Sequence, residues 1–300
     1  MKLKLTIWFA ACLALSILAF GELWGRLPEW LSPRGLQQYG VFHWGVLGLC
    51  FLWLWLKRKQ VFSNVPMGWA RPPFIVLGVC LLALSLFLPR SDSFLVFLML
   101  LGYLSVFTMI FGKASVIPLI LLSIYGFSVA FPILMLRALG EPAAKLVAST
   151  VTLLFNIFGL PVTSEGQVLQ LVSVTGESLS ATITPGCAAF TTLGVFIALF
   201  ALMTLDIRLT LKKMWWLFFL GLVGTWLQNI VRIVVSVAAG YLWGKDALVA
   251  MHYNTAYVIF PLWFALFTFI YLKQAGWRNK SARNTDSPSK VALSHTAMLE

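Results

Sequence analysis

Residues 94–111 read FLVFLMLLGYLSVFTMIF and contain no charged side chain. A helix of that length rises about 27 Å, close to the roughly 30 Å thickness of the hydrocarbon core of a bilayer. The whole chain has the same character: 60% of its 300 residues are hydrophobic and 11% are charged. A soluble protein carries about 25% charged residues. The sequence therefore predicts an all-α polytopic membrane protein.

Other segments share this apolar character, so we expect about eight transmembrane helices. They cover approximately residues 5–20, 41–56, 74–88, 94–111, 116–136, 187–205, 214–240 and 255–272. With an even number of spans both termini lie on one side, where most of the 22 lysines and arginines also fall. This bias predicts cytoplasmic termini in a cell (inner or plasma) membrane. The net charge of +12 thus marks orientation in the lipid bilayer, and no nucleic-acid partner is expected.

The expected spans divide the chain into four parts. An N-terminal bundle of five spans comes first, an outer-side segment follows, a three-span core holds the candidate catalytic residues, and a polar tail ends the chain. Their respective bounds are residues 1–136, 137–186, 187–272 and 273–300. The composition of the tail predicts a disordered cytoplasmic segment.

Two features of the outer-side segment carry structural signals. Residues 145–160 are apolar with interspersed Ser and Thr, which fits either a helix lying at the interface or a short element dipping into the membrane. In residues 167–184 hydrophobic and polar residues mostly alternate around Thr175-Gly176-Glu177. This pattern predicts a small hairpin on the outer side, just before the sixth span.

Cys187 is the first candidate catalytic residue. Thr184 is a plausible N-cap and Pro185 suits the first helical position, so the thiol is expected in the first turn of the sixth span. The positive end of a helix favours the thiolate, which is the nucleophilic form. The alternative interpretation is a buried, inert cysteine.

Arg232 is the single Lys or Arg that the expected topology places inside a span. It lies toward the outer end of the seventh span, within a stripe of polar residues that recur every three or four positions. The stripe consists of Thr225, Gln228, Asn229, Arg232 and Ser236. Intramembrane cations are costly and indicate function. The alternative is an arginine that reaches the headgroups, but such a residue needs no polar neighbours.

His252 immediately precedes the eighth span, where a lone histidine is often only an interfacial residue. The directions of the expected helices, however, place Cys187, Arg232 and His252 at one depth on the outer side. Cysteine and histidine form the nucleophile–base pair of acyl transfer. An arginine at the same level can stabilise an oxyanion or bind a carboxylate.

Other classes of site are not indicated. There is no CxxC, and the three histidines are scattered, so no metal is expected. A P-loop, a G-x-S-x-G motif and an H-E-x-x-H motif are also missing from the sequence, and no cofactor is expected. No Asp or Glu lies deep in an expected span, which weighs against proton-coupled or cation transport.

The order and spacing of these residues resemble the exosortase/archaeosortase family of membrane transpeptidases. The likeness rests on Cys187 after an alternating segment, Asn229-x-x-Arg232-Ile233, and His252 before an aromatic-rich span. It covers roughly residues 100–272. The resemblance implies a cysteine transpeptidase or protease whose active site faces outside. It would cleave C-terminal sorting signals of exported proteins, each made of a short motif, a transmembrane helix and a basic tail.

The resemblance also implies roles. Cys187 would attack the scissile carbonyl to give a thioacyl-enzyme, His252 would transfer protons, and Arg232 would hold the oxyanion or orient the substrate. Attack on the thioacyl-enzyme by an amine acceptor gives transpeptidation, and attack by water gives proteolysis. The sequence leaves both reactions open.

The sequence departs from the family pattern in two places. Family members typically continue the cysteine as Cys-Ser-Gly, whereas this chain has Ala188 and Ala189, and a glycine often found four residues beyond the histidine is Ala256 here. These changes indicate a divergent branch. Two other functions remain as alternatives: a non-enzymatic membrane component of a polysaccharide or export system, and a small-molecule transporter.

Overall fold

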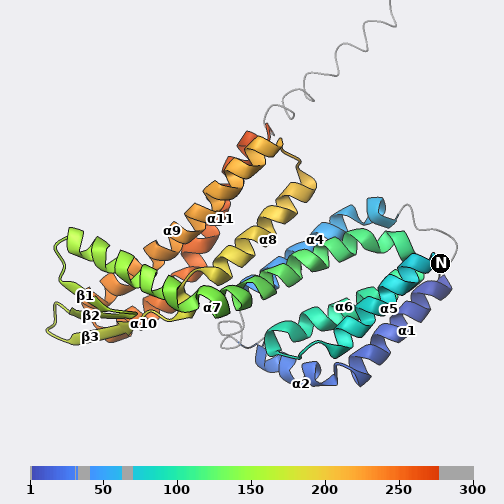
Figure 1. Cartoon of the computed structure of the whole chain (residues 1–300), viewed down its shortest axis with the longest axis horizontal. Coiled ribbons are helices and arrows are strands. Elements are labelled where there is room, and N and C mark those ends of the chain that lie inside the picture. The colour runs from blue at the N-terminus through green and yellow to red at the C-terminus, as the bar shows by residue number, and fades with distance from the viewer. Residues whose placement is uncertain (1, 31, 33–40, 63–69, 277–300) are drawn as a thin grey trace, which may run out of the picture. The chain divides into compact units, whose positions relative to one another are not determined.

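The computed structural model describes residues 2–30, 32, 41–62 and 70–276 (Figure 1). Each of the eight apolar segments is helical, and the described chain is mostly helical. Its internal contacts divide it into two units, which we describe separately. The first consists of residues up to Val172 together with Ser178–Leu202, and the second of Ser173–Glu177 together with residues from Met203 onward.

The first unit is a helical bundle with a small sheet. Its helices are α1 (Lys2–Leu18), α2 (Gly21–Trp30), α4 (Val41–Phe62), α5 (Pro72–Phe87), α6 (Asp92–Phe111), η1 (Gly112–Ser115), α7 (Val116–Ile157) and most of α8 (Phe190–Asp206). α6 packs against α1, α5 and α7, and α4 packs against α7. Helix α2, which the sequence did not predict, follows α1 at a bend of 77°.

Small residues bring the helices of this unit close together. A Cβ atom added at Gly78 of α5 would lie 2.8 Å from the Ser105 carbonyl oxygen of α6. A Cβ added at Gly194 of α8 would lie 3.2 Å from the Ser128 carbonyl oxygen of α7. In lipid, association of helices depends on such close packing, because the lipid tails are as apolar as the helix surfaces.

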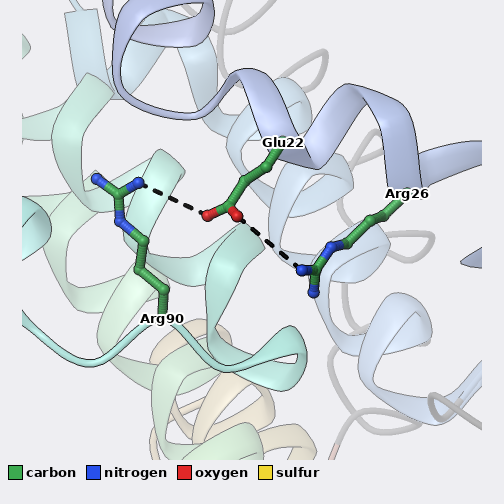
Figure 2. A network of polar contacts seen from close by, with 3 residues as sticks. All are labelled: Glu22, Arg26 and Arg90. Atoms are coloured by element: carbon green, nitrogen blue, oxygen red, sulfur yellow. Dashed lines mark ion pairs between the residues drawn. The ribbon is translucent and has the colours of Figure 1, made fainter.

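A polar network ties α2 to the segment between α5 and α6. The Glu22 carboxylate lies 3.6 Å from Arg90 and 4.0 Å from Arg26, and Figure 2 shows it between the two guanidinium groups. All three side chains are more than one-third exposed. Pairs of this kind contribute at most about 1 kcal/mol each, so the network adds little to the stability of the bundle.

Helix α7 is longer than the sequence predicted. The expected fifth span ended at residue 136, but α7 continues without a break to Ile157 and includes Pro132 and Pro142. Residues 145–157 therefore belong to α7 and do not form a separate element. The 42 residues of α7 rise about 63 Å, twice the thickness of the hydrocarbon core. Part of α7 must therefore lie outside that core.

A three-stranded antiparallel sheet follows α7. Its strands are β1 (Val162–Glu165), β2 (Val168–Val172) and β3 (Ser178–Thr182), in the order β1-β2-β3. β2 and β3 fall in the segment for which a hairpin was expected, and they pair in a register that sets Leu169 opposite Ala181. β1 was not predicted, because its sequence VTSE lacks an alternating apolar pattern. β1 and β2 pack against α7 (Figure 1).

The second unit contains α9 (Leu211–Trp243), α10 (Lys245–Asn254) and α11 (Ala256–Gln274). Gly244 turns the chain between α9 and α10 with a φ of +85°, a conformation that favours glycine. α10 then folds back along α9, where a Cβ at Gly240 would lie 2.8 Å from the Leu248 side chain. α11 packs on α9 through Trp263, whose indole N–H donates to the Thr225 hydroxyl at 3.0 Å.

The chain is a multi-pass membrane protein. Four continuous helical stretches in the described residues are long and apolar enough to cross a membrane, or five if the bent α1–α2 pair counts as one span. The residues of α6 from Phe94 onward, η1 and the whole of α7 form a single such stretch, and α5 is short at 16 residues. The count of eight spans and the orientation of the termini therefore stay predictions.

The two compact units follow internal contacts, whereas the expected division into four parts follows membrane spans and stays a prediction. The expected core of residues 187–272 is divided between them, since α8 belongs mostly to the first unit. Residues 277–300 of the expected tail lie outside the described residues, whereas Lys273 and Gln274 belong to α11.

Candidate active site

Cys187 lies in a single turn of 3-10 helix, η2 (Pro185–Cys187), which follows the sheet. The sequence placed this thiol in the first turn of the sixth span, but α8 begins three residues later, at Phe190. Thr184 stands at the N-cap of η2 as expected, although its hydroxyl does not cap the backbone. The hydroxyl oxygen instead lies 3.5 Å from the Cys187 sulfur. The turn is closed by the Cys187 N–H, which donates to the Thr184 carbonyl at 2.8 Å.

Helix α7 supports this turn. A Cβ added at Gly140 would lie 3.0 Å from the Pro185 ring, so any larger residue would require Pro185 to move away slightly. The Cys187 side chain is buried, with 6% of its surface exposed. Thr184, α7 and η2 thus hold the thiol in one place within the first unit.

The connection from η2 to α8 has an unusual backbone. Ala189 has a φ of +67° and is the one residue other than glycine with a positive φ among the described residues. Its carbonyl accepts hydrogen bonds from the Leu193 N–H at 2.8 Å and the Thr192 hydroxyl at 2.9 Å, so Ala189 initiates α8. This is the position where the resembling family typically has glycine, a residue that adopts positive φ without strain.

Arg232 lies on α9 in the predicted polar stripe. Its four companions, Thr225, Gln228, Asn229 and Ser236, are all buried, and Arg232 is partly buried. The Ser236 hydroxyl donates to the Arg232 carbonyl at 2.8 Å, and the Thr225 hydroxyl accepts from the Trp263 indole N–H. Burial of polar groups is costly without a hydrogen bond, and for these two hydroxyls the protein supplies one.

Gln228 is the residue of the stripe that sequence reasoning undervalued. Only 7% of its surface is exposed, and its amide oxygen has no hydrogen-bond partner among the described residues. Buried polar atoms in proteins are nearly always hydrogen-bonded. Gln228 precedes Arg232 by one helical turn, so both side chains lie on the same face of α9.

His252 is partly buried and lies in the last turn of α10. Leu248 of α10 contacts α9 at Gly240. Because α10 runs back along α9, His252, one turn beyond Leu248, lies near the level of Ser236. Arg232 is one further turn along α9. His252 and Arg232 are therefore separated by about one helical turn along the second unit.

The three predicted residues thus belong to different units: Cys187 to the first, and Arg232 and His252 to the second. Their convergence at one depth stays a prediction. Sequence reasoning also missed the contact between Thr184 and Cys187 and the backbone conformation of Ala189. The unusual backbone of Ala189 could have been suspected from the sequence, because Ala188 and Ala189 replace the Ser-Gly that is typical of the family. Within the described residues, no three His, Cys, Asp or Glu side chains form a group that could hold a metal ion.

Comparison with known proteins gives one match. A family model described as transmembrane exosortase matches residues 30–269, which include η2 and all the helices of the second unit except the end of α11. No curated protein and no solved structure matches the chain.

Proposed function

The chain belongs to the transmembrane exosortase family, and on that premise we propose that it is a cysteine-dependent transpeptidase or protease of the membrane. Its substrates are exported proteins that end in a C-terminal sorting signal with a short motif, an apolar helix and a basic tail. The apolar helix lies in the bilayer beside the enzyme, with the scissile peptide bond at the outer boundary, where the active site faces.

The buried amide of Gln228 in the polar stripe of α9 is the observation that carries the proposal. Its oxygen has no hydrogen-bond partner among the described residues, and such burial is costly in an apolar helix unless the oxygen meets a polar ligand. A peptide segment provides such a ligand, because its backbone supplies N–H donors for the Gln228 oxygen.

In the proposed reaction the Cys187 thiolate attacks the carbonyl carbon of the scissile bond. The carbonyl oxygen becomes negatively charged, and the guanidinium of Arg232 stabilises it or orients the substrate. The C–N bond then breaks, and His252 gives a proton to the departing amine. A thioester between Cys187 and the exported protein remains.

Release of the product reverses these proton movements. An amine or a water molecule attacks the thioester, and His252 takes its proton. The thiolate of Cys187 leaves, so the enzyme returns to its starting state without an external oxidant or reductant. The hydroxyl of Thr184, 3.5 Å from the sulfur, can donate a hydrogen bond to the thiolate between turnovers.

The test is the processing of a co-expressed protein that carries a sorting signal encoded in the same genome. Cys187→Ala is expected to abolish cleavage while the protein still inserts and accumulates. Cys80→Ala is the matched control, since Cys80 is an exposed cysteine on α5 with no role in the proposal. Normal cleavage by the Cys187→Ala variant would refute the proposed function.

A further inference from the structure

An apolar cavity opens within the first unit, at a distance along the chain from the residues discussed above. It has a volume of about 360 Å³, within the range of small-molecule sites. Residues of helices α1, α4, α6 and α7 line the cavity, and they include Trp8, Leu54 and Leu104. Three of the polar groups in its wall are engaged: the Trp8 indole N–H donates to the Tyr103 carbonyl at 3.1 Å, the Tyr103 hydroxyl contacts Ser16, and the Cys50 thiol donates to the Leu121 carbonyl at 3.7 Å. The hydroxyl of Tyr125 belongs to a fourth lining residue. The cavity therefore suits an apolar chain.

An open groove with a basic rim lies next to the cavity along α4. The groove has a volume of about 510 Å³ and shares Phe51 and Leu54 with the cavity. It also contains Trp55, Arg58 and Lys59, and no acidic residue lines either space among the described residues. A site that is apolar at one end and positively charged at the other fits an amphiphile with an anionic head.

The geometry of α4 matches one leaflet of a membrane. The lining residues of α4 begin at Leu47 and end at Lys59. This stretch rises about 18 Å, slightly more than half of the roughly 30 Å hydrocarbon core. Trp55 lies near the basic end, as tryptophans do at the boundary between lipid tails and headgroups.

Contacts with Trp55 fix the position of the Arg58 guanidinium at the basic end of the groove. The guanidinium lies over the Trp55 ring, 4.2 Å from the ring centroid, and its Nη1 donates to the Trp55 carbonyl at 3.0 Å. An arginine has five N–H donors, so one hydrogen bond leaves several for a phosphate. Lys59 is exposed beside it and adds a second positive charge.

From these observations we infer that the first unit holds a binding site for an anionic phospholipid. One acyl chain lies in the cavity between α4, α6 and α7, and the phosphate lies on Arg58 and Lys59. A sorting-signal helix is a poor occupant, because its basic tail would meet the same two cations. The site is independent of the proposed reaction and uses none of its residues.

The experiment titrates the purified full chain in detergent micelles with phosphatidylglycerol or phosphatidylcholine, and native mass spectrometry counts the bound lipid. Phosphatidylglycerol is expected to bind more tightly. Each cation near a membrane surface contributes about 1 kcal/mol toward anionic lipid. The double variant Arg58→Gln/Lys59→Gln should therefore lower the affinity for phosphatidylglycerol by roughly 30-fold. Its affinity for phosphatidylcholine should not change.

Matched variants distinguish binding at this site from the general effect of removing positive charge or adding a tryptophan ring elsewhere. Arg208→Gln/Lys212→Gln removes the same charge from exposed positions in the second unit and should leave both affinities unchanged. Leu54→Trp fills the space that cavity and groove share, and should weaken both lipids. Leu52→Trp places the same ring on α4 outside the cavity, where Leu52 is exposed, and should have no effect.

Three results would overturn the inference. The first is equal affinity of the unmodified protein for the two lipids, and the second is unchanged phosphatidylglycerol binding in Arg58→Gln/Lys59→Gln. The third is displacement of phosphatidylglycerol by a synthetic apolar helix with an arginine tail, since that would identify the site as one for sorting signals. The charge variant alters only exposed side chains, so it tests the inference even if Leu54→Trp fails to fold.

Discussion

Replacing Ala189 with glycine should stabilise the protein, although an alanine-to-glycine change usually does the opposite. Ala189 has a φ of +67°, and a left-handed backbone costs a residue with a Cβ about 1–2 kcal/mol. Glycine escapes this cost but loses roughly 0.5–1 kcal/mol more conformational entropy on folding. The difference predicts that Ala189→Gly raises the free energy of unfolding by about 0.5–1 kcal/mol.

Ala188 provides a matched control one residue away. It is as buried as Ala189, with 3% of its surface exposed, but its φ of −83° is ordinary. Ala188→Gly should therefore lower the free energy of unfolding by roughly 0.5–1 kcal/mol. Thermal and denaturant unfolding in detergent micelles would compare the two variants under identical conditions. If both variants lose stability to the same extent, the reasoning from the backbone of Ala189 is refuted.

Three further variants test other features of the structure. Thr184→Val removes the hydroxyl beside the Cys187 sulfur and, at about 0.5–1.5 kcal/mol per hydrogen bond, should slow the reaction of that thiol with iodoacetamide roughly threefold to tenfold. Gly78→Ala should destabilise the packing of α5 on α6 by about 1–3 kcal/mol, seen as a lower midpoint of thermal unfolding. Gln228→Met removes a buried oxygen that has no partner among the described residues, so stability should stay the same or rise while cleavage of a sorting signal falls.

Two of these variants, Thr184→Val and Gly78→Ala, have matched controls. Thiol labelling uses a Cys80→Ala background, and Thr184→Ser should retain the original rate. Gly48→Ala should be neutral or stabilising, because nothing lies within 4 Å of a Cβ at that position. Faster labelling of Thr184→Val, equal stability of Gly78→Ala and Gly48→Ala, or full cleavage by Gln228→Met would each contradict the corresponding argument.

The sequence predicted the helices that the membrane requires. In lipid every backbone polar group must be satisfied within the segment, so an apolar run such as residues 94–111 must form a helix. The continuation of α7 was missed because Arg137, Glu141 and Pro142 look like the end of a span. The hydrophobic pattern does not predict that the helix continues past these residues, whereas in the structure α7 packs against β1, β2 and η2, with Gly140 close to Pro185. Helices α2 and α10 were missed for the same reason, since both are short and contain charged residues.

In the candidate site, too, some features could be predicted from the residue pattern and others depend on contacts in the folded protein. Arg232 and its stripe could be predicted because polar residues are rare in an apolar helix, and their periodicity gives the face they share. The 3-10 turn at Cys187 and the backbone of Ala189 could not, because local backbone conformation over a few residues depends on contacts such as that of Pro185 with Gly140. Thr184 was predicted to cap a backbone group, but its hydroxyl lies beside the sulfur instead.

Helix α7 has a mechanical consequence of its own. It forms part of the wall of the apolar cavity at Leu121 and supports the turn of Cys187 at Gly140. The two positions are about 28 Å apart along the helix, and Pro132 lies between them. Proline removes one backbone hydrogen bond of a helix, so α7 can bend at this point. A change in direction of about 5° there would shift Gly140, about 12 Å further along the helix, by roughly 1 Å. A misplacement of about 1 Å between reacting groups can cost on the order of 100-fold in rate.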